Sequence, residues 1–277
     1  MVDLTRTVRF CVNPPTPPTG PDTRAGDLSN NTFAGAPSMV GLGRYYELEV
    51  RCRGEVDPAT GYFVNIKEID RATRATAIPI IERACRDEPT AEPAAVLLRV
   101  LPELGRALHG RVRSVRWRLT PYYSVEMPSS QPSSTAPAVA LMRQQFDFAA
   151  AHRLHAPGLS DADNRAVFGK CNNPKGHGHN YRLEPCVEVA VGAGPGFRLA
   201  DLERIVAETI LARFDHTHLN EDTPQFDQRL PGGLNPSVEN IAKVFFDLLG
   251  PEIARHHARL RSVTVWETDK TSCTYPG

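Results

Sequence analysis

Polar and apolar residues alternate along parts of the chain, and a period of two is typical of β-strands with one buried face. Residues 44–56 and 180–191 have this alternating or β-branched character. Shorter apolar stretches at 114–119 and 262–268 predict a closing strand in each half of the chain.

Four other segments carry apolar residues at helical spacing. They are residues 66–86, 93–109, 199–214 and 236–257. We expect Pro79 to break the first helix, because an interior proline removes a backbone hydrogen bond. Asn235 before Pro236, with Glu239 in the first turn, predicts the start of the last helix. Strands, two helices and further strands in each half indicate an α+β fold, with the helices on one face of an antiparallel sheet.

A stretch rich in serine and proline separates the two halves. Residues 127–139 offer little to bury, so we expect an extended linker there. The sequence therefore predicts one unit at 1–126 and a second unit at 140–277.

The two halves also resemble each other. A gapless shift of 135 positions, as from Gly41 to Gly176, brings seven identical pairs into register. The pairs are Phe33 and Phe168, Gly41 and Gly176, Gly43 and Gly178, Tyr46 and Tyr181, Leu48 and Leu183, Glu49 and Glu184, and Gly61 and Gly196. An ancient duplication explains these matches, and chance similarity between two β-rich halves is the alternative.

The second half carries a pattern typical of a metal site. His177 and His179 lie two residues apart on a predicted strand, so both imidazoles point to one face. With His152 from a neighbouring strand they form a three-nitrogen platform for catalytic zinc, whose fourth position stays open. Cys171 is then free to act as a base, and Lys170 beside it favours the thiolate. The alternatives are three structural histidines and an inert buried thiol.

The first half lacks this set of residues. It has Ala36, Leu42 and Arg44 at the positions of Cys171, His177 and His179. Neither leucine nor arginine ligates zinc. The first half is therefore predicted to keep the scaffold as a degenerate unit without a zinc site.

Two further positions of the second half carry ionisable groups suited to catalysis. Asp215 can fix the tautomer of His216 and stabilise its protonated form, which makes the pair a candidate proton relay. An ordinary histidine at a helix C-terminus is the alternative. Glu267, at the end of an apolar strand, could accept two N–H bonds from a flat heterocycle, or form a cross-strand ion pair.

Composition excludes several classes of function. The chain has 32 basic and 32 acidic residues and a formal net charge of zero, so neither nucleic acid nor a membrane surface is expected as a partner. Its six cysteines form no CxxC pair and its first residues form no apolar signal core. A reduced, cytoplasmic setting is the resulting expectation.

The second half resembles the 6-pyruvoyltetrahydropterin synthase family. The matching blocks are residues 146–154, 168–181, 214–220, 236–242 and 265–268. The Cys-x5-His-x-His element from Cys171 to His179 is the most specific of them. The first half resembles a degenerate copy of the same fold.

This resemblance implies two tandem T-fold units that assemble into a multi-subunit barrel with active sites at subunit interfaces. It implies zinc ligands at His152, His177 and His179, and a general base at Cys171. It further implies a relay at Asp215 and His216, a pterin-anchoring carboxylate at Glu267 and a substrate contact at Ser237. A homo-oligomer follows, with a trimer of two-unit chains as the simplest count.

The implied reaction converts 7,8-dihydroneopterin triphosphate to 6-pyruvoyltetrahydropterin with elimination of triphosphate. Lys170, Lys175 and Arg165 are candidates to bind the anionic chain of this substrate. One alternative is 6-carboxytetrahydropterin synthase of queuosine biosynthesis, which uses the same substrate and releases acetaldehyde. Another is a pterin- or zinc-binding protein without turnover, although binding alone needs no general base.

Overall fold

The computed structural model describes residues 1–14, 39, 41–130, 137–192 and 196–277. Within these residues the chain divides into two compact units. Unit 1 comprises Met1–Met142 with Ala190–Gly194, and unit 2 comprises Arg143–Val189 with Pro195–Gly277. No helix among the described residues is long and apolar enough to cross a membrane.

Unit 1 is built on an antiparallel sheet in which consecutive strands are neighbours. Its strands are β1 (Val2–Val12), β2 (Arg44–Gly54), β3 (Val112–Arg118) and β4 (Tyr123–Pro128), with β5 (Ala138–Gln144) next to β4. The register pairs Phe10 with Tyr46 and Leu48 with Trp117. These side chains are buried, because alternate residues of each strand face the helices.

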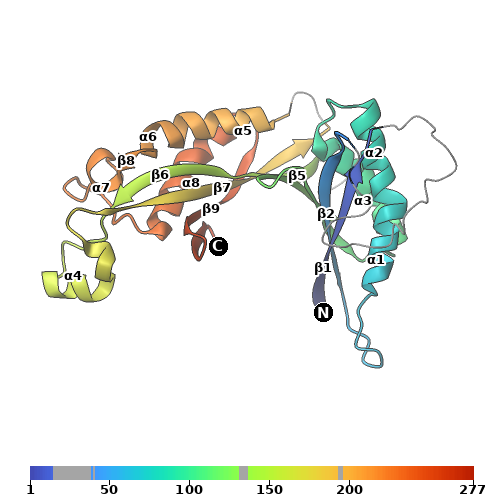
Figure 1. Ribbon diagram of the computed structural model, residues 1–277, viewed down its shortest axis with the longest axis horizontal. Coiled ribbons are helices and arrows are strands. Elements are labelled where there is room, and N and C mark those ends of the chain that lie inside the picture. Colours follow the sequence, from blue (N-terminus) through green and yellow to red (C-terminus); the bar gives the residue numbers. More distant parts are fainter. Residues whose placement is uncertain (15–38, 40, 131–136, 193–195) are drawn as a thin grey trace. The chain divides into compact units, whose positions relative to one another are not determined.

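The helices of unit 1 pack against this sheet (Figure 1). They are α1 (Ile66–Ala72), a π-helical stretch (Thr73–Ala77), α2 (Ile78–Asp87) and α3 (Pro93–Ala107). The expected break at Pro79 is wrong, since the helical path continues from Ile66 to Asp87. Pro79 lies in the first turn of α2, where a missing N–H costs little, and the π-helical stretch precedes it.

Unit 2 repeats this order of long strands, with the short strand β8 (Thr217–His218) added at the edge beside β6 (Phe146–His152). Its sheet runs β10 (Thr271–Tyr275), β9 (Arg259–Thr268), β7 (His177–Val191), β6 and β8. Only β8 is parallel to its neighbour among the pairs described for this unit. Aromatic side chains fill the space between the sheet and the helices, with Phe148 stacked on Tyr181 and Phe245 against Phe214.

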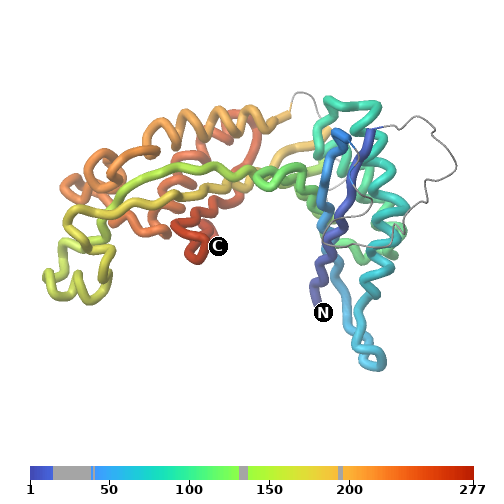
Figure 2. Tube along the Cα trace, viewed as in Figure 1, coloured from blue at the N-terminus to red at the C-terminus, as the bar shows by residue number. Residues whose placement is uncertain are grey.

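The helices of unit 2 include a second π-helical stretch. They are α4 (Asp161–Phe168), a short 3-10 helix (Gly169–Asn172), α5 (Leu199–Val206), the π-helical stretch (Ala207–Leu211), α6 (Ala212–Phe214), α7 (Leu219–Asp222) and α8 (Val238–Ala254). The segment with α4 leaves the sheet where β6 ends and returns where β7 begins (Figure 2).

Helix α8 begins later than predicted. Its N-cap is Ser237, whose hydroxyl accepts a hydrogen bond from the Asn240 N–H at 3.4 Å. Asn235 lies two residues before this cap, and its side chain accepts a hydrogen bond from the His155 N–H at 3.1 Å. The prediction of a start at Asn235 was therefore wrong by two residues, because a serine cap follows the proline.

The predicted linker 127–139 is also shorter than expected. Strand β4 includes Met127, which is fully buried and pairs with Val115, and β5 begins at Ala138. The sequence composition did not reveal that these ends pair in the sheet. The middle of the predicted linker, residues 131–136, lies outside the described residues.

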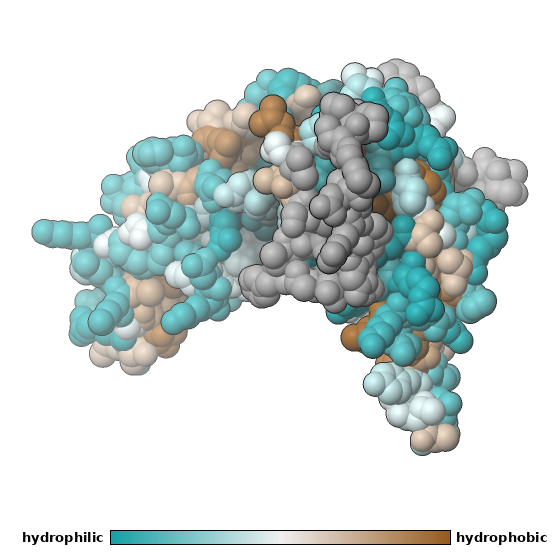
Figure 3. Space-filling model, turned by 45° about the vertical axis from the view of Figure 1, so that its right-hand side comes forward, coloured by the Kyte–Doolittle hydropathy of each residue, from teal (hydrophilic) through white to brown (hydrophobic). Residues whose placement is uncertain are grey.

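Both units present the same order of elements. Each has long strands, a helix continued through a π-helical stretch into a second helix, one long helix, and two closing strands. The duplication itself stays a prediction, and two residues of the sequence comparison, Phe33 and Ala36, lie outside the described residues. On the face in Figure 3, hydrophobic residues among those coloured form small separate patches within a mainly hydrophilic surface.

Candidate active site

The register of β6 and β7 brings three histidines together. His152 and His177 are direct cross-strand partners at the ends of these strands, and His179 lies opposite Ala150. His177 and His179 share one face because side chains alternate along β7. His152 is fully buried, whereas the other two are half-buried.

The imidazoles converge with their nitrogen atoms in reach of one ion. One ring nitrogen from each of His152, His177 and His179 lies within 4.8 Å of the others. The Nε2 atoms of His152 and His177 are 3.2 Å apart. His152 Nδ1 lies 2.7 Å from the carbonyl oxygen of Pro236, to which it can donate. That bond fixes the tautomer and leaves Nε2 as a lone-pair donor toward the cluster.

Electrostatics also favours neutral imidazoles. Burial lowers the pKa of His152 to about 4, with smaller effects from the neighbouring histidines. Burial likewise lowers the pKa of His177. His179 Nε2 is buried and has no hydrogen-bond partner among the described residues. Three converging ring nitrogens, one of them buried and without a hydrogen-bond partner, fit a tetrahedral zinc ion with one position open.

Glu267 lies at the edge of this cluster. Its Oε1 is 3.4 Å from His152 Nε2 and 3.7 Å from His179 Nε2. The carboxylate raises the pKa of His177, an effect that is outweighed by burial. Its predicted role as an anchor for a heterocycle stays a prediction.

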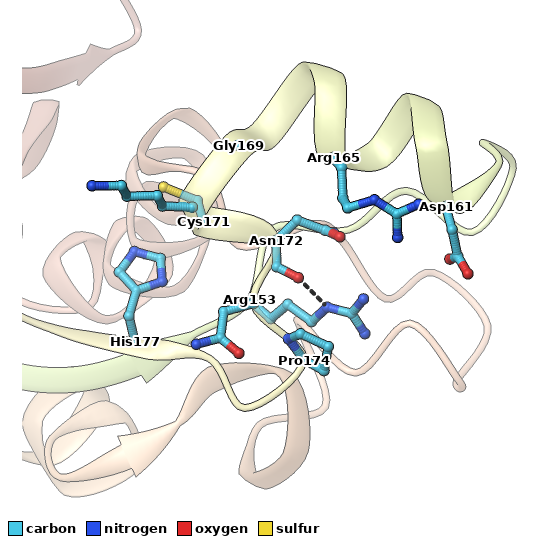
Figure 4. A pocket seen from close by; sticks show the side chains of 10 residues that line it. Arg153, Asp161, Arg165, Gly169, Cys171, Asn172, Pro174 and His177 are labelled. Carbon is cyan, nitrogen blue, oxygen red and sulfur yellow. Dashed lines mark hydrogen bonds between the residues drawn. The ribbon is translucent and has the colours of Figure 1, made fainter.

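Cys171 lies beside the histidines in a cavity of about 690 Å³. In Figure 4 its thiol and the His177 ring are at one end, and Arg165 and Asp161 are at the other. The cavity is lined by Arg153, Asp161, Arg165, Gly169, Lys170, Cys171, Asn172, Asn173, Pro174 and His177. Of the predicted anion-binding residues it includes Arg165 and Lys170, whereas Lys175 is not among its lining residues.

The loop that carries Cys171 is tied to the end of β6. The Leu154 N–H donates to the Cys171 carbonyl at 2.9 Å, and the Asn172 side-chain amide donates to the Leu154 carbonyl at 2.7 Å. Arg153 Nε donates to the Asn172 carbonyl at 3.2 Å. Sequence reasoning missed Arg153, although its position directly after His152 was a usable signal.

Asp215 and His216 form the predicted pair. Asp215 Oδ1 accepts a hydrogen bond from the Ala149 N–H at 2.8 Å, and Oδ2 lies 2.9 Å from His216 Nδ1. The Ala149 N–H, together with His216 and against the effect of burial, holds the pKa of Asp215 below its usual range. His216 itself is 82% exposed and has a positive φ of 57°. The carboxylate is therefore fixed and the imidazole is open to solvent.

Among the described residues, His216 and Cys171 line different cavities. His216 lines a second cavity of about 490 Å³ together with His179 and His218. His218, which was not predicted from the sequence, is the third imidazole in the lining of this cavity, after His179 and His216. The structure thus brings the three histidines, Cys171 and Glu267 together, and places His216 in a different cavity, which His179 also lines.

Ser237 has a structural role in addition to its predicted contact with substrate. It caps α8 directly after Pro236, the residue whose carbonyl holds His152. Its hydroxyl therefore helps to fix the backbone behind a candidate ligand. The predicted contact with substrate is not required to explain this serine.

Comparison with known proteins identifies the family. A family model described as 6-pyruvoyl tetrahydropterin synthase matches residues 141–277. The 6-pyruvoyl tetrahydrobiopterin synthase of Poecilia reticulata is 35% identical over 156 residues, which are 54% of this chain and 99% of that relative. The chain belongs to the 6-pyruvoyl tetrahydropterin synthase family.

Other members of the synthase family match the same part of the chain. The 6-pyruvoyl tetrahydrobiopterin synthase of Homo sapiens is 36% identical over 140 residues, covering 50% of this chain and 92% of the relative. A solved structure of Caenorhabditis elegans 6-pyruvoyl tetrahydropterin synthase is 35% identical, covers 51% of this chain and 98% of its own, and has a TM-score of 0.46. The region matched by the synthase model holds every candidate site residue, whereas residues 1–140 lie outside it.

Proposed function

We propose that the chain is a zinc-dependent lyase that converts 7,8-dihydroneopterin triphosphate to 6-pyruvoyltetrahydropterin with elimination of triphosphate. The observation that carries this proposal is the convergence of three imidazoles, one of which, His177, lines the same cavity as the Cys171 thiol. Metal binding alone does not need such a thiol, and the related synthases named above support the reaction.

His152, His177 and His179 would hold the zinc ion, with Pro236 orienting His152. When bound, zinc supplies Lewis-acid polarisation, which acidifies carbon-bound hydrogens next to the substrate hydroxyl groups. Cys171 lies at the same end of the cavity as His177 and takes a proton from the substrate side chain. Glu267 modulates the proton content of the histidine cluster.

The far end of the Cys171 cavity suits the triphosphate. Arg153, Arg165 and Lys170 contribute three cationic side chains to its lining, against one carboxylate from Asp161. Guanidinium groups bind phosphate oxygens through paired, charge-assisted hydrogen bonds. The polyanionic part of the substrate would thus lie toward α4, and its pterin-bearing part nearer the histidines.

His216, held by Asp215, handles a proton on the opposite face of a substrate. Since His216 and Cys171 line different cavities of one chain, we infer that His216 serves an active site completed by a second copy of the chain. A homo-oligomer follows, in which two T-fold units per chain contribute to a barrel; a trimer is the simplest count. Unit 1 contributes architecture and no zinc site in this proposal.

The test is a product assay on the purified full-length chain. Dihydroneopterin triphosphate is incubated with the zinc-loaded protein, and triphosphate and pterin products are identified by mass. We expect triphosphate and 6-pyruvoyltetrahydropterin. Acetaldehyde with 6-carboxytetrahydropterin would replace the proposal by the queuosine-pathway reaction, and binding without triphosphate release would replace it by a non-catalytic role. Metal analysis should find one zinc per chain.

A further inference from the structure

Unit 1 contains a cavity of about 480 Å³ at the end of its sheet. It lies where β1 ends and β2 begins, next to α2, which packs against β1 (Figure 1). Its lining residues are Cys11, Val12, Asn13, Pro14, Leu42, Arg44, Glu82, Cys85 and Arg86. All of them belong to unit 1, and none belongs to the active site proposed above.

The central cation of this cavity is Arg44. Val12 and Arg44 are cross-strand partners, and alternation places Arg44 on the same face as the buried Tyr46. The guanidinium hydrogen-bonds the Tyr46 hydroxyl and the Cys85 thiol, and these neighbours raise the pKa of Arg44. Among the described residues, no carboxylate is paired with it in an ion pair. Arg44 therefore brings a positive charge to the cavity that neutral partners leave uncompensated.

Two further side chains that can carry a charge, Arg86 and Glu82, line the same cavity. Arg86 is paired with Asp87, Nε to Oδ1 at 2.9 Å, so its charge is already offset. Burial raises the pKa of Glu82, against the effect of Arg86. The guanidinium of Arg44, which has no carboxylate partner among the described residues, is therefore the group of this cavity best placed to bind an anion.

Apolar surface surrounds this charge. Val12, Pro14 and Leu42 line the cavity, and the Leu42 side chain is 95% exposed, so it is available to contact a ligand. The cavity is also much larger than an inorganic ion needs, and falls in the size range of small-molecule sites. An occupant with an anionic group and an apolar body would use both features.

Comparison of the units adds an independent observation. Arg44 and Tyr46 occupy the positions in unit 1 that His179 and Tyr181 occupy in unit 2, at the constant shift of 135. In unit 2 the Tyr181 hydroxyl lies 3.3 Å from His152 Nδ1, behind the metal centre. The guanidinium of Arg44 in unit 1 thus occupies the position at which unit 2 has the imidazole of His179, a candidate ligand of a cation. The same end of the sheet keeps a cavity in both units.

We propose that the unit 1 cavity binds a small organic oxyanion, a carboxylate or a phosphate ester, through Arg44. The two oxygens of the anion accept paired hydrogen bonds from the guanidinium. The body of the ligand lies against Leu42 and Val12, and bound ligand covers the half-buried Cys85. This site is independent of zinc and of turnover in unit 2.

Protection of Cys85 from alkylation tests the proposal at a single residue. The full-length chain carries Cys171→Ala, which removes turnover and the thiol of the other cavity. It is treated with iodoacetamide alone or with benzoate, phenyl phosphate or neutral benzamide, and the Cys85 peptide is quantified by mass spectrometry. At about ten times the dissociation constant, benzoate or phenyl phosphate should slow alkylation of Cys85 about tenfold, by mass action. Benzamide should leave the rate unchanged.

Variants of the same chain test whether Arg44 is the residue that binds the anion. Arg44→Leu should abolish protection and Arg44→Lys should weaken it, since lysine keeps the charge and loses the paired hydrogen bonds. Arg51→Leu, at an exposed position of the same strand that does not line the cavity, should keep full protection. Unchanged protection in Arg44→Leu, equal protection by benzamide, or no protection by either anion would overturn the proposal. None of these results depends on whether unit 2 is a lyase.

Discussion

His152 illustrates how single residues define this site. Its ring is fully buried, one nitrogen is bound by a backbone carbonyl, and the other faces two further imidazoles. Burial keeps it neutral, which is the state a metal needs. A buried, oriented and neutral imidazole beside two others is therefore suited to ligate a metal ion.

The single residue Cys52 gives a prediction of how the stability of the fold depends on pH. Burial raises the pKa of its thiol from an ordinary value of 9.0 to about 11. The folded state therefore keeps a proton that the unfolded state loses between these pH values, so stability falls as pH rises from 9 to 11. By pH 11 the raised pKa of Cys52 should have lowered the free energy of unfolding by about 2 kcal/mol. Urea unfolding of the wild type and Cys52→Ala under reducing conditions should show a flatter pH profile in the variant; parallel profiles would contradict the shift.

At the scale of elements, the start of α8 positions the metal centre. Ser237→Ala should cost about 1 kcal/mol of unfolding free energy, because it removes the helix cap. It should also weaken zinc binding, since the Pro236 carbonyl that holds His152 precedes the cap. Urea unfolding and zinc titration measure the two effects.

Ser237→Asn separates this structural role from a contact with substrate. Asparagine caps helices as well as serine does, so stability and zinc affinity should be retained. If Ser237 also binds substrate, KM should rise in this variant while the cap is intact. Ser160→Ala, which removes the cap of α4 instead, controls for helix capping in general.

The turn before β7 has a glycine that cannot be replaced. Gly176 has a φ of +69°, and a Cβ there would lie 2.6 Å from His218 Nε2 and 3.0 Å from the His152 carbonyl. Gly176→Ala should therefore cost about 2 kcal/mol or more and reduce zinc content. Gly178→Ala is the matched control, because its Cβ would meet only the Ala150 carbonyl at 3.6 Å. Similar losses in both variants would argue against a specific constraint at Gly176.

Much of the element order was predictable from hydrophobic spacing, and the exceptions have local causes. The expected break at Pro79 was wrong because a proline in a first turn fits a helix. The start of α8 was misplaced because a serine after Pro236 competes successfully with Asn235 for the cap.

Those residues of the candidate site were predictable whose spacing along a single strand determines the face on which they lie. The pair His177 and His179 needs only strand alternation to share a face. The contact of Glu267 with the histidines depends on the register between β7 and β9, which no local pattern reports. Separation of His216 from Cys171 is likewise a property of the sheet, since His216 directly precedes β8, which pairs with β6, and lines a different cavity.

At the scale of the molecule, each unit contains one of the two tryptophans, Trp117 in unit 1 and Trp266 in unit 2. Trp117→Phe and Trp266→Phe therefore give fluorescence reporters for one unit each. Zinc at about one hundred times its dissociation constant should raise the unfolding free energy reported by Trp266 by about 2.7 kcal/mol, because only the folded state binds it. The Trp117 signal should not shift. Adding His177→Ala should remove the Trp266 shift, and a shift that persists would place the ion elsewhere.

Mixing inactive chains tests whether the active site is shared between copies. Cys171→Ala should retain zinc and lose at least about a hundredfold in turnover, as expected for a general base, and His216→Ala should also be inactive. If each site takes Cys171 from one chain and His216 from another, unfolding and refolding the two variants together should restore measurable triphosphate release. A mixture as inactive as its components would show that both residues act within one chain.

The cross-strand pairing of His152 with His177 has a consequence for how this site can evolve. These two residues close the hairpin formed by β6 and β7, and the intervening segment 153–176 carries the thiol and the cationic side chains. Apart from Gly176, which contacts His152 and His218 closely, residues of that segment can change while the β6–β7 ladder keeps its register and the imidazoles keep their places. The lineage can therefore alter which substrates are accepted and how they react without rebuilding the metal centre.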